Sequence, residues 1–345
     1  MEIIVHGKAS LLLLTLVAGP ASVRGEEPVV SDPLYSRPQR LVEIEPGRKL
    51  NLYCVGEGKP TVIFDSGLGG GTEMWAPVQA TVAKNVRACS YDRAGINFSD
   101  PSARPSSSAN IADDLHRLLV AASIEPPYVL VGHSYGGMNV RVFADKYTEE
   151  VAGMVLVDPS HEDQSEGYRS LDPKKASREE WASQREPRLS YLRKCGVAAS
   201  DGFVAGTEVY KECVNETDSL FGEAINAAYL KLQLSPGYWQ ALLSENESVF
   251  AASSDQVRAS RKSYGDMPLI VLTRSPAPKR ESETQEERDS SNRLWLALHD
   301  DIAALSTTGL NRVVPDSGHA IQFDQPQSVI EAIAQIVRSA QKSDR

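Results

Sequence analysis

Short apolar runs alternate with segments of helical periodicity along most of this chain. Such runs are typical of strands buried on both faces of a parallel sheet. The predicted strands are Leu41–Ile44, Leu50–Val55, Thr61–Asp65, Val86–Tyr91, Tyr128–Val131, Val151–Val157, Leu269–Leu272 and Asn311–Val314. The spacing of apolar residues predicts helices at Ile111–Val120, Met138–Tyr147 and Ser328–Ala340. This order predicts an α/β fold in which helices flank a mostly parallel sheet.

The alternation stops after Val157 and resumes at Leu269. Residues 161–266 are polar and helical in pattern, so we expect a helical insert that divides the core into residues 41–160 and 267–345. Residues 26–40 are polar and rich in proline, which favours an extended lead-in. The charged stretch 279–293 predicts a solvated loop that leads into a helix near Trp295. The aromatic residues of the insert either form its own core or line a pocket; they are Trp181, Tyr191, Tyr229, Tyr238, Trp239 and Phe250.

The N-terminus has the layout of a secretory signal peptide. Lys8 precedes an apolar run at residues 9–18 that is too short to span a bilayer, and small residues follow at Ala21 and Gly25. We therefore expect residues 1–25 to be removed and the mature chain to be secreted or periplasmic. The alternative is that the segment stays uncleaved and anchors the chain to a membrane; the rest of the sequence predicts no stable span.

Composition and charge are those of an ordinary globular protein. Of the 345 residues, 41% are hydrophobic and 24% are charged. The formal net charge of −10 argues against nucleic acid and against anionic membrane surfaces as partners.

The predicted export changes how the four cysteines are interpreted. In an oxidising compartment an even number of cysteines favours two disulfides, for which three pairings exist. Cys195 with Cys213 would close a loop inside the insert, and Cys54 with Cys89 would pair if their two strands are neighbours. Four buried thiols are the alternative. Neither a Cys-x-x-Cys spacing nor a His/Cys cluster indicates a metal site.

One motif carries most of the chemical information. The strand at 128–131 runs into Gly132-His133-Ser134-Tyr135-Gly136, and a helix follows. This is the G-x-S-x-G pattern of a nucleophile elbow, in which a strained strand-to-helix turn exposes a serine hydroxyl. The glycines are required where a Cβ would collide with the neighbouring backbone.

Further motifs follow other strands in the expected places. A glycine-rich turn, Ser66-Gly67-Leu68-Gly69-Gly70, follows the third strand, and Tyr91-Asp92-Arg93-Ala94-Gly95 follows the fourth. Ser317-Gly318-His319 and Asp324-Gln325-Pro326 follow the last. Together with the elbow, these motifs resemble those of the α/β-hydrolase fold superfamily, and specifically of serine hydrolases with an inserted helical cap. The resemblance covers residues 40–340 apart from the insert.

The resemblance implies a catalytic triad in the chain order serine, acid, histidine. Ser134 is then the nucleophile and His319 the general base. Asp158, directly after the strand that ends at Val157, is the first choice for the acid. The second possible position lies after the strand at 269–272, where the family's Gly-x-x-Asp continuation is missing. The carboxylates available there are Glu281, Glu283, Glu286, Glu287 and Asp289.

The resemblance also implies an oxyanion hole made by the backbone N–H groups of Leu68 and Tyr135. Ser66 stands where the family usually has a histidine, and Asn97 stands where it usually has a glycine. Asparagine tolerates positive φ, so the turn at Asn97 can be kept. Arg93 is interpreted as a buried structural arginine held by carboxylates. The side chain of His133 is expected to point away from the site.

These residues predict a serine hydrolase that cleaves a small or medium carboxylic ester through an acyl-enzyme, without cofactor or metal. Its partner would be a small ester-like molecule; oligomeric state is left open. The alternatives on the same fold are a C–C bond hydrolase, a cofactor-free peroxidase, a proline-specific peptidase and a ligand-binding protein without catalysis.

Overall fold

A computed structural model describes residues 28–171 and 183–343 of the chain. Its strands are β1 (Leu41–Glu45), β2 (Arg48–Val55), β3 (Thr61–Asp65), β4 (Ala88–Tyr91), β5 (Tyr128–His133), β6 (Val151–Val157), β7 (Leu269–Arg274) and β8 (Leu310–Val314). The helices that flank them are α1 (Ala76–Val82), α2 (Ser108–Ala121), α3 (Tyr135–Lys146), α11 (Gln285–Ala303), α12 (Ile321–Asp324) and α13 (Pro326–Ser343). Short 3-10 helices are η1 (Pro33–Ser36), η2 (Thr72–Trp75) and η3 (Thr148–Glu150). Each predicted strand is present, with ends shifted by two residues at most.

The strands form one eight-stranded sheet in the order β1-β2-β4-β3-β5-β6-β7-β8. β2 pairs antiparallel with both β1 and β4, and the other neighbours are parallel. The predicted α/β fold with a mostly parallel sheet is therefore confirmed. Because parallel strands end at the same edge of a sheet, the loops after β3, β5, β6 and β8 can meet there.

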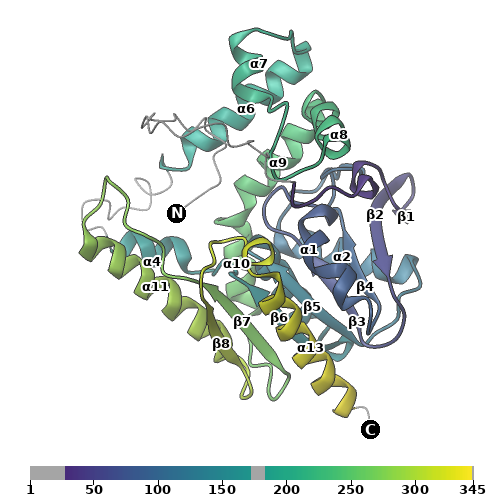
Figure 1. Ribbon diagram of the computed structural model, residues 1–345, viewed down its shortest axis with the longest axis vertical. Helices are drawn as coiled ribbons and strands as arrows, with labels where there is room; N and C mark the ends of the chain where they lie inside the picture. Colours follow the sequence, from purple (N-terminus) through teal and green to yellow (C-terminus); the bar gives the residue numbers. More distant parts are fainter. Residues whose placement is uncertain (1–27, 172–182, 344–345) are drawn as a thin grey trace, which may run out of the picture.

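Side chains of the central strands alternate between two buried faces. In β3, Val62 and Phe64 contact the apolar cluster that contains α1 and α13, whereas Ile63 contacts the cluster that contains α2 and α3. Figure 1 shows α13 crossing in front of the sheet. All five residues of β3 are buried, which explains why its sequence is a continuous apolar run rather than an alternating one.

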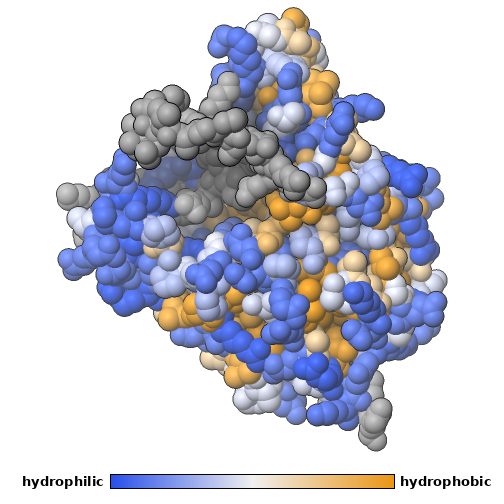
Figure 2. Space-filling model, viewed as in Figure 1, coloured by the Kyte–Doolittle hydropathy of each residue, from blue (hydrophilic) through white to orange (hydrophobic). Residues whose placement is uncertain are grey.

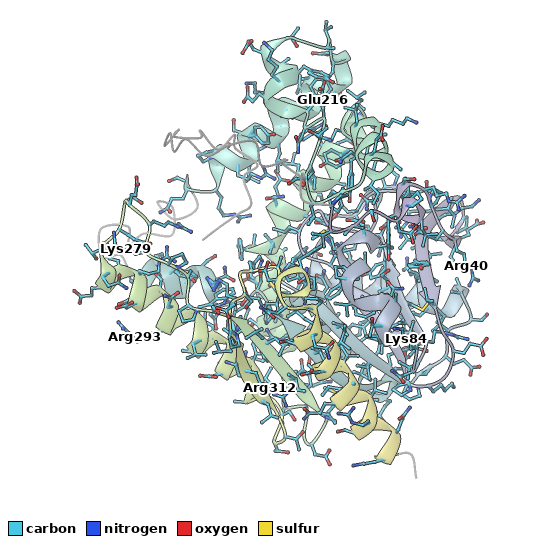
Figure 3. All side chains as sticks on the ribbon, viewed as in Figure 1. Arg40, Lys84, Glu216, Lys279, Arg293 and Arg312 are labelled. Atoms are coloured by element: carbon cyan, nitrogen blue, oxygen red, sulfur yellow. A yellow bond between two sulfur atoms is a disulfide. The ribbon has the colours of Figure 1, made fainter. Side chains whose placement is uncertain are left out.

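Two predictions about connecting segments need correction. The charged stretch 279–293 is not a loop throughout, because α11 begins at Gln285, where Thr284 and Glu287 form a capping box. Most of its charged side chains are exposed, as are those of Lys279 and Arg293 at the outer edge of the molecule (Figure 3), but Arg288 is buried and pairs with Glu283. The lead-in is not simply extended, because it contains η1.

The insertion between β6 and β7 is helical, as predicted. Its described helices are α4 (Gln164–Ser170), α6 (Glu186–Asp201), α7 (Glu208–Cys213), α8 (Glu223–Gln233), α9 (Pro236–Val249) and α10 (Ala252–Ser260). Figure 1 shows α6, α7 and α8 standing above the sheet, while α10 packs on α2 and α3. The lead-in meets the insertion through a backbone bridge between Val30 and Phe221, and Tyr35 and Ile225 share an apolar cluster there.

The structure contains two disulfides, as the even number of cysteines favours, and it decides between the three pairings that the sequence left open. Cys54 and Cys89 are direct partners in the register of β2 and β4, and Cys195 joins α6 to Cys213 at the end of α7. Disulfides persist in oxidising compartments, so the two bonds are consistent with a chain that works outside the reducing cytosol. The signal peptide predicted at residues 1–25 lies outside the described residues. Within the described parts, no helix combines the length and apolar character that crossing a membrane requires.

The two disulfides are expected to differ in their contribution to stability. Cys54–Cys89 closes a loop of sequence separation 35, and Cys195–Cys213 closes one of 18. Chain-entropy arguments give about 4 kcal/mol for the longer loop and about 3 kcal/mol for the shorter one. The Cys54→Ala/Cys89→Ala variant should therefore lose more unfolding free energy in urea than Cys195→Ala/Cys213→Ala. Losses below about 1 kcal/mol for both variants would contradict the assignment of structural disulfides.

Candidate active site

The turn between β5 and α3 has the strained geometry expected of a nucleophile elbow. Ser134 has φ +51° and ψ −116°, a conformation that L-residues rarely adopt. A Cβ on Gly132 would lie 2.6 Å from the Gly136 carbonyl oxygen, and one on Gly136 would lie 2.2 Å from the Asp65 carbonyl oxygen. Both glycines are therefore required by close backbone contacts, as the sequence predicts, and the serine is held at the start of a helix.

The structure brings Asp158 and His319 together. Nδ1 of His319, in the loop after β8, lies 2.6 Å from Oδ2 of Asp158, at the end of β6. The other oxygen of Asp158 accepts hydrogen bonds from the Arg274 backbone N–H at 3.0 Å and from Trp295 Nε1 at 2.8 Å. Because Nδ1 faces the carboxylate, Nε2 is the nitrogen left to accept a proton.

The electrostatic surroundings keep Asp158 ionised. Burial raises its pKa, but the hydrogen bond and positive charge of His319 outweigh burial and hold the pKa at about 2. An ionised Asp158 orients the imidazole and stabilises its protonated form. Sequence reasoning missed Trp295 as a partner of this carboxylate, because nothing near Trp295 in the sequence indicates the contact.

Three of the five alternative carboxylates have other partners, and the remaining two, Glu281 and Glu286, are exposed. Glu283 pairs with Arg288, Glu287 caps α11, and Asp289 accepts from Gln285 within that helix. Ser134 follows β5, the neighbour of β6, so its backbone lies at the same edge of the sheet as Asp158. Its hydroxyl makes no hydrogen bond within the described chain; catalytic contacts are often loose without substrate.

The turn after β3 is braced differently from the family pattern. Ser66, in place of the usual histidine, donates its hydroxyl to the Gly71 carbonyl at 2.8 Å. The N–H groups of Leu68 and Tyr135, predicted as oxyanion donors, have no acceptor among the residues described. Asn97 has φ +44°, as its tolerance of positive φ predicts, and donates to Glu73 at 2.7 Å.

Arg93 holds this turn through hydrogen bonds, and its burial between two carboxylates confirms that it is a structural residue. Its side chain is only 3% exposed and bonds Asp65 at 2.7 Å and Glu245 at 2.6 Å. It also donates to the backbone carbonyls of Ser66 and Gly67, both at 2.6 Å. No sequence pattern indicates the contact with Glu245, which lies in α9 of the insertion, 152 residues from Arg93 along the chain.

The prediction for His133 was wrong. Its side chain does not point away from the site: the ring centroid lies 4.8 Å from that of His319, and Nε2 lies 3.0 Å from the His319 carbonyl oxygen. Nδ1 is buried and has no hydrogen-bond partner among the residues that the structure describes. Burial and the nearby His319 lower the pKa of His133 to about 3, so the ring is neutral and donates Nε2–H to the carbonyl. His133 therefore packs the loop that carries His319 against the elbow.

A large cleft opens between the insertion and the edge of the sheet. Its volume is about 2480 Å³, and on the core side it is lined by Leu68, Gly69 and Ala320, the last being the neighbour of His319. Figure 2 shows apolar residues at the centre of this face, below the insertion. The aromatic residues of the insertion that line the cleft are Tyr168, Tyr191, Phe221, Tyr229, Tyr238 and Trp239. Trp239 also belongs to the insertion's own core, whereas Phe250 packs on the main core and Trp181 lies outside the described residues.

Comparisons with known proteins agree with this architecture. A family model described as alpha/beta hydrolase fold matches residues 60–186, which include the elbow and Asp158. The protein has the α/β-hydrolase fold. Among curated proteins it is similar to the uncharacterized protein YqjL of Bacillus subtilis, with 26% identity over 81% of this chain and 83% of that protein.

Solved structures show the same fold at low sequence identity. A thermophilic esterase from Thermogutta terrifontis superposes with a TM-score of 0.51 and 20% identity, over 88% of this chain and 99% of that one. The epoxide hydrolase CorEH superposes with a TM-score of 0.56 and 15% identity, over 86% and 96%. Within residues 28–171 and 183–343, no group of three His, Cys, Asp or Glu residues has the arrangement of a metal site.

Buried neutral histidines should make the folded state of this protein sensitive to acid. Burial lowers the pKa of His133 to about 3 and that of His299 to about 4, from 6.5 in the unfolded chain. At a pH between the folded-state pKa and the unfolded-state pKa of such a histidine, the unfolded chain binds more protons than the folded chain. The contribution of each neutral histidine to the unfolding free energy is therefore fully present above pH 6.5 and decreases as the pH falls below that value. From pH 7 to pH 5 each histidine should cost about 2 kcal/mol of unfolding free energy.

His133→Gln, whose amide N–H can still reach the His319 carbonyl, removes one of these groups. Urea unfolding at pH 7 and pH 5 should show a smaller loss for the variant than for the wild type, by about 2 kcal/mol. Equal losses in both proteins would show that His133 binds a proton as readily in the folded chain as in the unfolded one.

Proposed function

We propose that this α/β-hydrolase is a serine hydrolase that cleaves a small or medium carboxylic ester through an acyl-enzyme. The observation that carries the proposal is the short contact between His319 Nδ1 and the buried Asp158 carboxylate, 2.6 Å, beside a serine at a strained elbow. This combination supplies a nucleophile, a base and a group that orients the base.

The proposed reaction uses these groups in two half-reactions. Ser134 Oγ attacks the carbonyl carbon of the ester while Nε2 of His319 takes its proton. The negative charge that develops on the carbonyl oxygen is stabilised by the N–H groups of Leu68 and Tyr135. His319 then gives the proton to the departing alcohol, and water repeats the sequence to release the acid.

The nucleophile distinguishes this proposal from the chemistry of epoxide hydrolases. Those enzymes use a carboxylate at the elbow, and this chain has Ser134 there. C–C bond hydrolysis, cofactor-free peroxidation and proline-specific peptide hydrolysis use the same triad and are the alternatives. The cleft of about 2480 Å³ with its aromatic lining favours a substrate with apolar groups over a short polar peptide.

The proposed place of action is outside the cytosol, by secretion or export to the periplasm. The two disulfides support this location, and so does the signal-like sequence at residues 1–25. N-terminal sequencing of the exported protein would test the proposed cleavage near Ala21 or Gly25.

The nucleophile is tested with a fluorophosphonate probe and a series of p-nitrophenyl esters of increasing acyl length. The wild type should be labelled and should hydrolyse the shorter esters, because Ser134 is activated by His319. Ser134→Ala should lose both the label and at least about 10⁴-fold in kcat. An unlabelled wild type would favour a ligand-binding protein, and activity on N-terminal proline peptides alone would favour the peptidase.

The acid is tested by Asp158→Asn, which keeps the shape of the side chain but favours the wrong imidazole tautomer. We expect kcat to fall by about 10³- to 10⁴-fold while ester binding is little affected. Glu283→Gln, at the alternative position, serves as the control and should stay close to wild type. If Glu283→Gln lost activity and Asp158→Asn did not, the acid of the triad would instead be Glu283, in the segment after β7.

A further inference from the structure

The helical insertion contacts the backbone of the turn that follows β3 through a polar side chain that is itself buried. The carboxylate of Glu245, in α9, is 0% exposed. Its Oε2 accepts the N–H of Gly69 at 2.7 Å, and Gly69 directly follows Leu68. Thus the residue beside a proposed oxyanion donor is held by a side chain from the insertion and not from the core.

The same carboxylate is tied to the core through Arg93. Glu245 accepts from Arg93 Nε at 2.6 Å and from Nη2 at 3.0 Å, while Arg93 donates to the carbonyls of Ser66 and Gly67. Three N–H donors therefore converge on Glu245, and a carboxylate, which has only acceptors, satisfies all of them. The guanidinium also neutralises a charge that would otherwise oppose an oxyanion nearby.

Shape reinforces this contact. Gly69 has φ +72°, and a Cβ there would lie 2.7 Å from a methyl carbon of Leu242, one turn before Glu245 in α9. A Cβ on Gly95 would likewise lie 2.8 Å from Ala241 Cβ. One face of α9 is therefore pressed directly on the glycines of the two turns that follow β3 and β4.

The second proposed oxyanion donor has its own link to the insertion. The hydroxyl of Tyr135 donates to the Ser106 carbonyl at 2.6 Å and lies 2.8 Å from Ser253 Oγ in α10. Ser253 also accepts the N–H of Ser108 at 3.0 Å. Both residues that provide the proposed donors are thus fixed, directly or through one neighbour, by side chains of α9 and α10.

We infer that Glu245 is a positioning residue, through which the insertion sets the geometry of the oxyanion hole. This inference rests on the proposed serine hydrolase function. The insertion then does more than cover the substrate: its docking on the core fixes the Leu68 amide in the orientation that stabilises the transition state. Displacing α9 should reduce turnover even where substrate binding is kept.

The test is Glu245→Gln, assayed with p-nitrophenyl butyrate and with butylboronic acid as a tetrahedral inhibitor. In glutamine, an NH2 group must face either Arg93 or the Gly69 N–H, so the turn loses one acceptor. We expect kcat to fall by about 10- to 100-fold with KM within about threefold, less than the loss of a whole oxyanion donor. The inhibition constant of the boronic acid should rise by a similar factor.

Glu162→Gln is the matched control. Glu162 also lies in the insertion and is also 0% exposed in a two-bond ion pair, with Arg141 of α3, but it does not contact the turn after β3. Both variants should lower the melting temperature, and only Glu245→Gln should change kcat and the inhibition constant. Equal kcat and inhibition constants for Glu245→Gln and Glu162→Gln, despite a similar loss of melting temperature, would overturn the inference.

Ser253→Ala decides the question if Glu245→Gln gives no folded protein. It breaks the second link while Tyr135 keeps its bond to the Ser106 carbonyl, and we expect kcat to fall about three- to tenfold at constant KM. A kcat within twofold of wild type would overturn the inference. A wild type that neither reacts with fluorophosphonate nor hydrolyses an ester would instead overturn the proposed function, and the inference with it.

Discussion

A single buried guanidinium, that of Arg93, connects the parts of the molecule on which the proposed chemistry depends. It joins Asp65 at the end of β3, the carbonyls of the following turn and Glu245 of the insertion. Burial alone would lower the pKa of Arg93, but the charges of Glu245 and Asp65 more than offset it. Charges are costly to bury without partners, so removing one member of this group is expected to destabilise the others.

The close packing around Arg93 explains why glycines are concentrated in the turn after β3. The turn after β3 runs between the elbow on one side and α9 on the other. Space there is limited: a Cβ on Gly67 would lie 2.9 Å from His133 Nδ1, and one on Gly69 would meet Leu242. The backbone can pass between the two only if residues 67 and 69 lack side chains, and this brings Gly67 so close to the elbow that a Cβ on it would lie 3.4 Å from Ser134 Cβ.

The three proposed catalytic residues lie at the same edge of the sheet because parallel strands end at the same edge. Ser134, Asp158 and His319 follow β5, β6 and β8, and the contact between Asp158 and His319 spans 161 residues of sequence. Trp295 and the Arg274 N–H complete the hydrogen bonding of the buried carboxylate from two further elements. The order of the strands thus places residues that are distant in the sequence next to one another in space.

The sequence by itself determined what depends on neighbouring residues. Strands buried on both faces are recognisable from composition, the elbow from two glycines that close contacts require, and Asn97 from its tolerance of positive φ. It also identified Arg93 as structural and the two cysteine pairs as possible partners. Only the tertiary structure decided which carboxylate meets His319, that His133 packs on the His319 loop, and that Glu245 of the insertion holds the turn after β3. These are contacts between segments far apart in the chain, and their energies depend on burial and register, which no local pattern encodes.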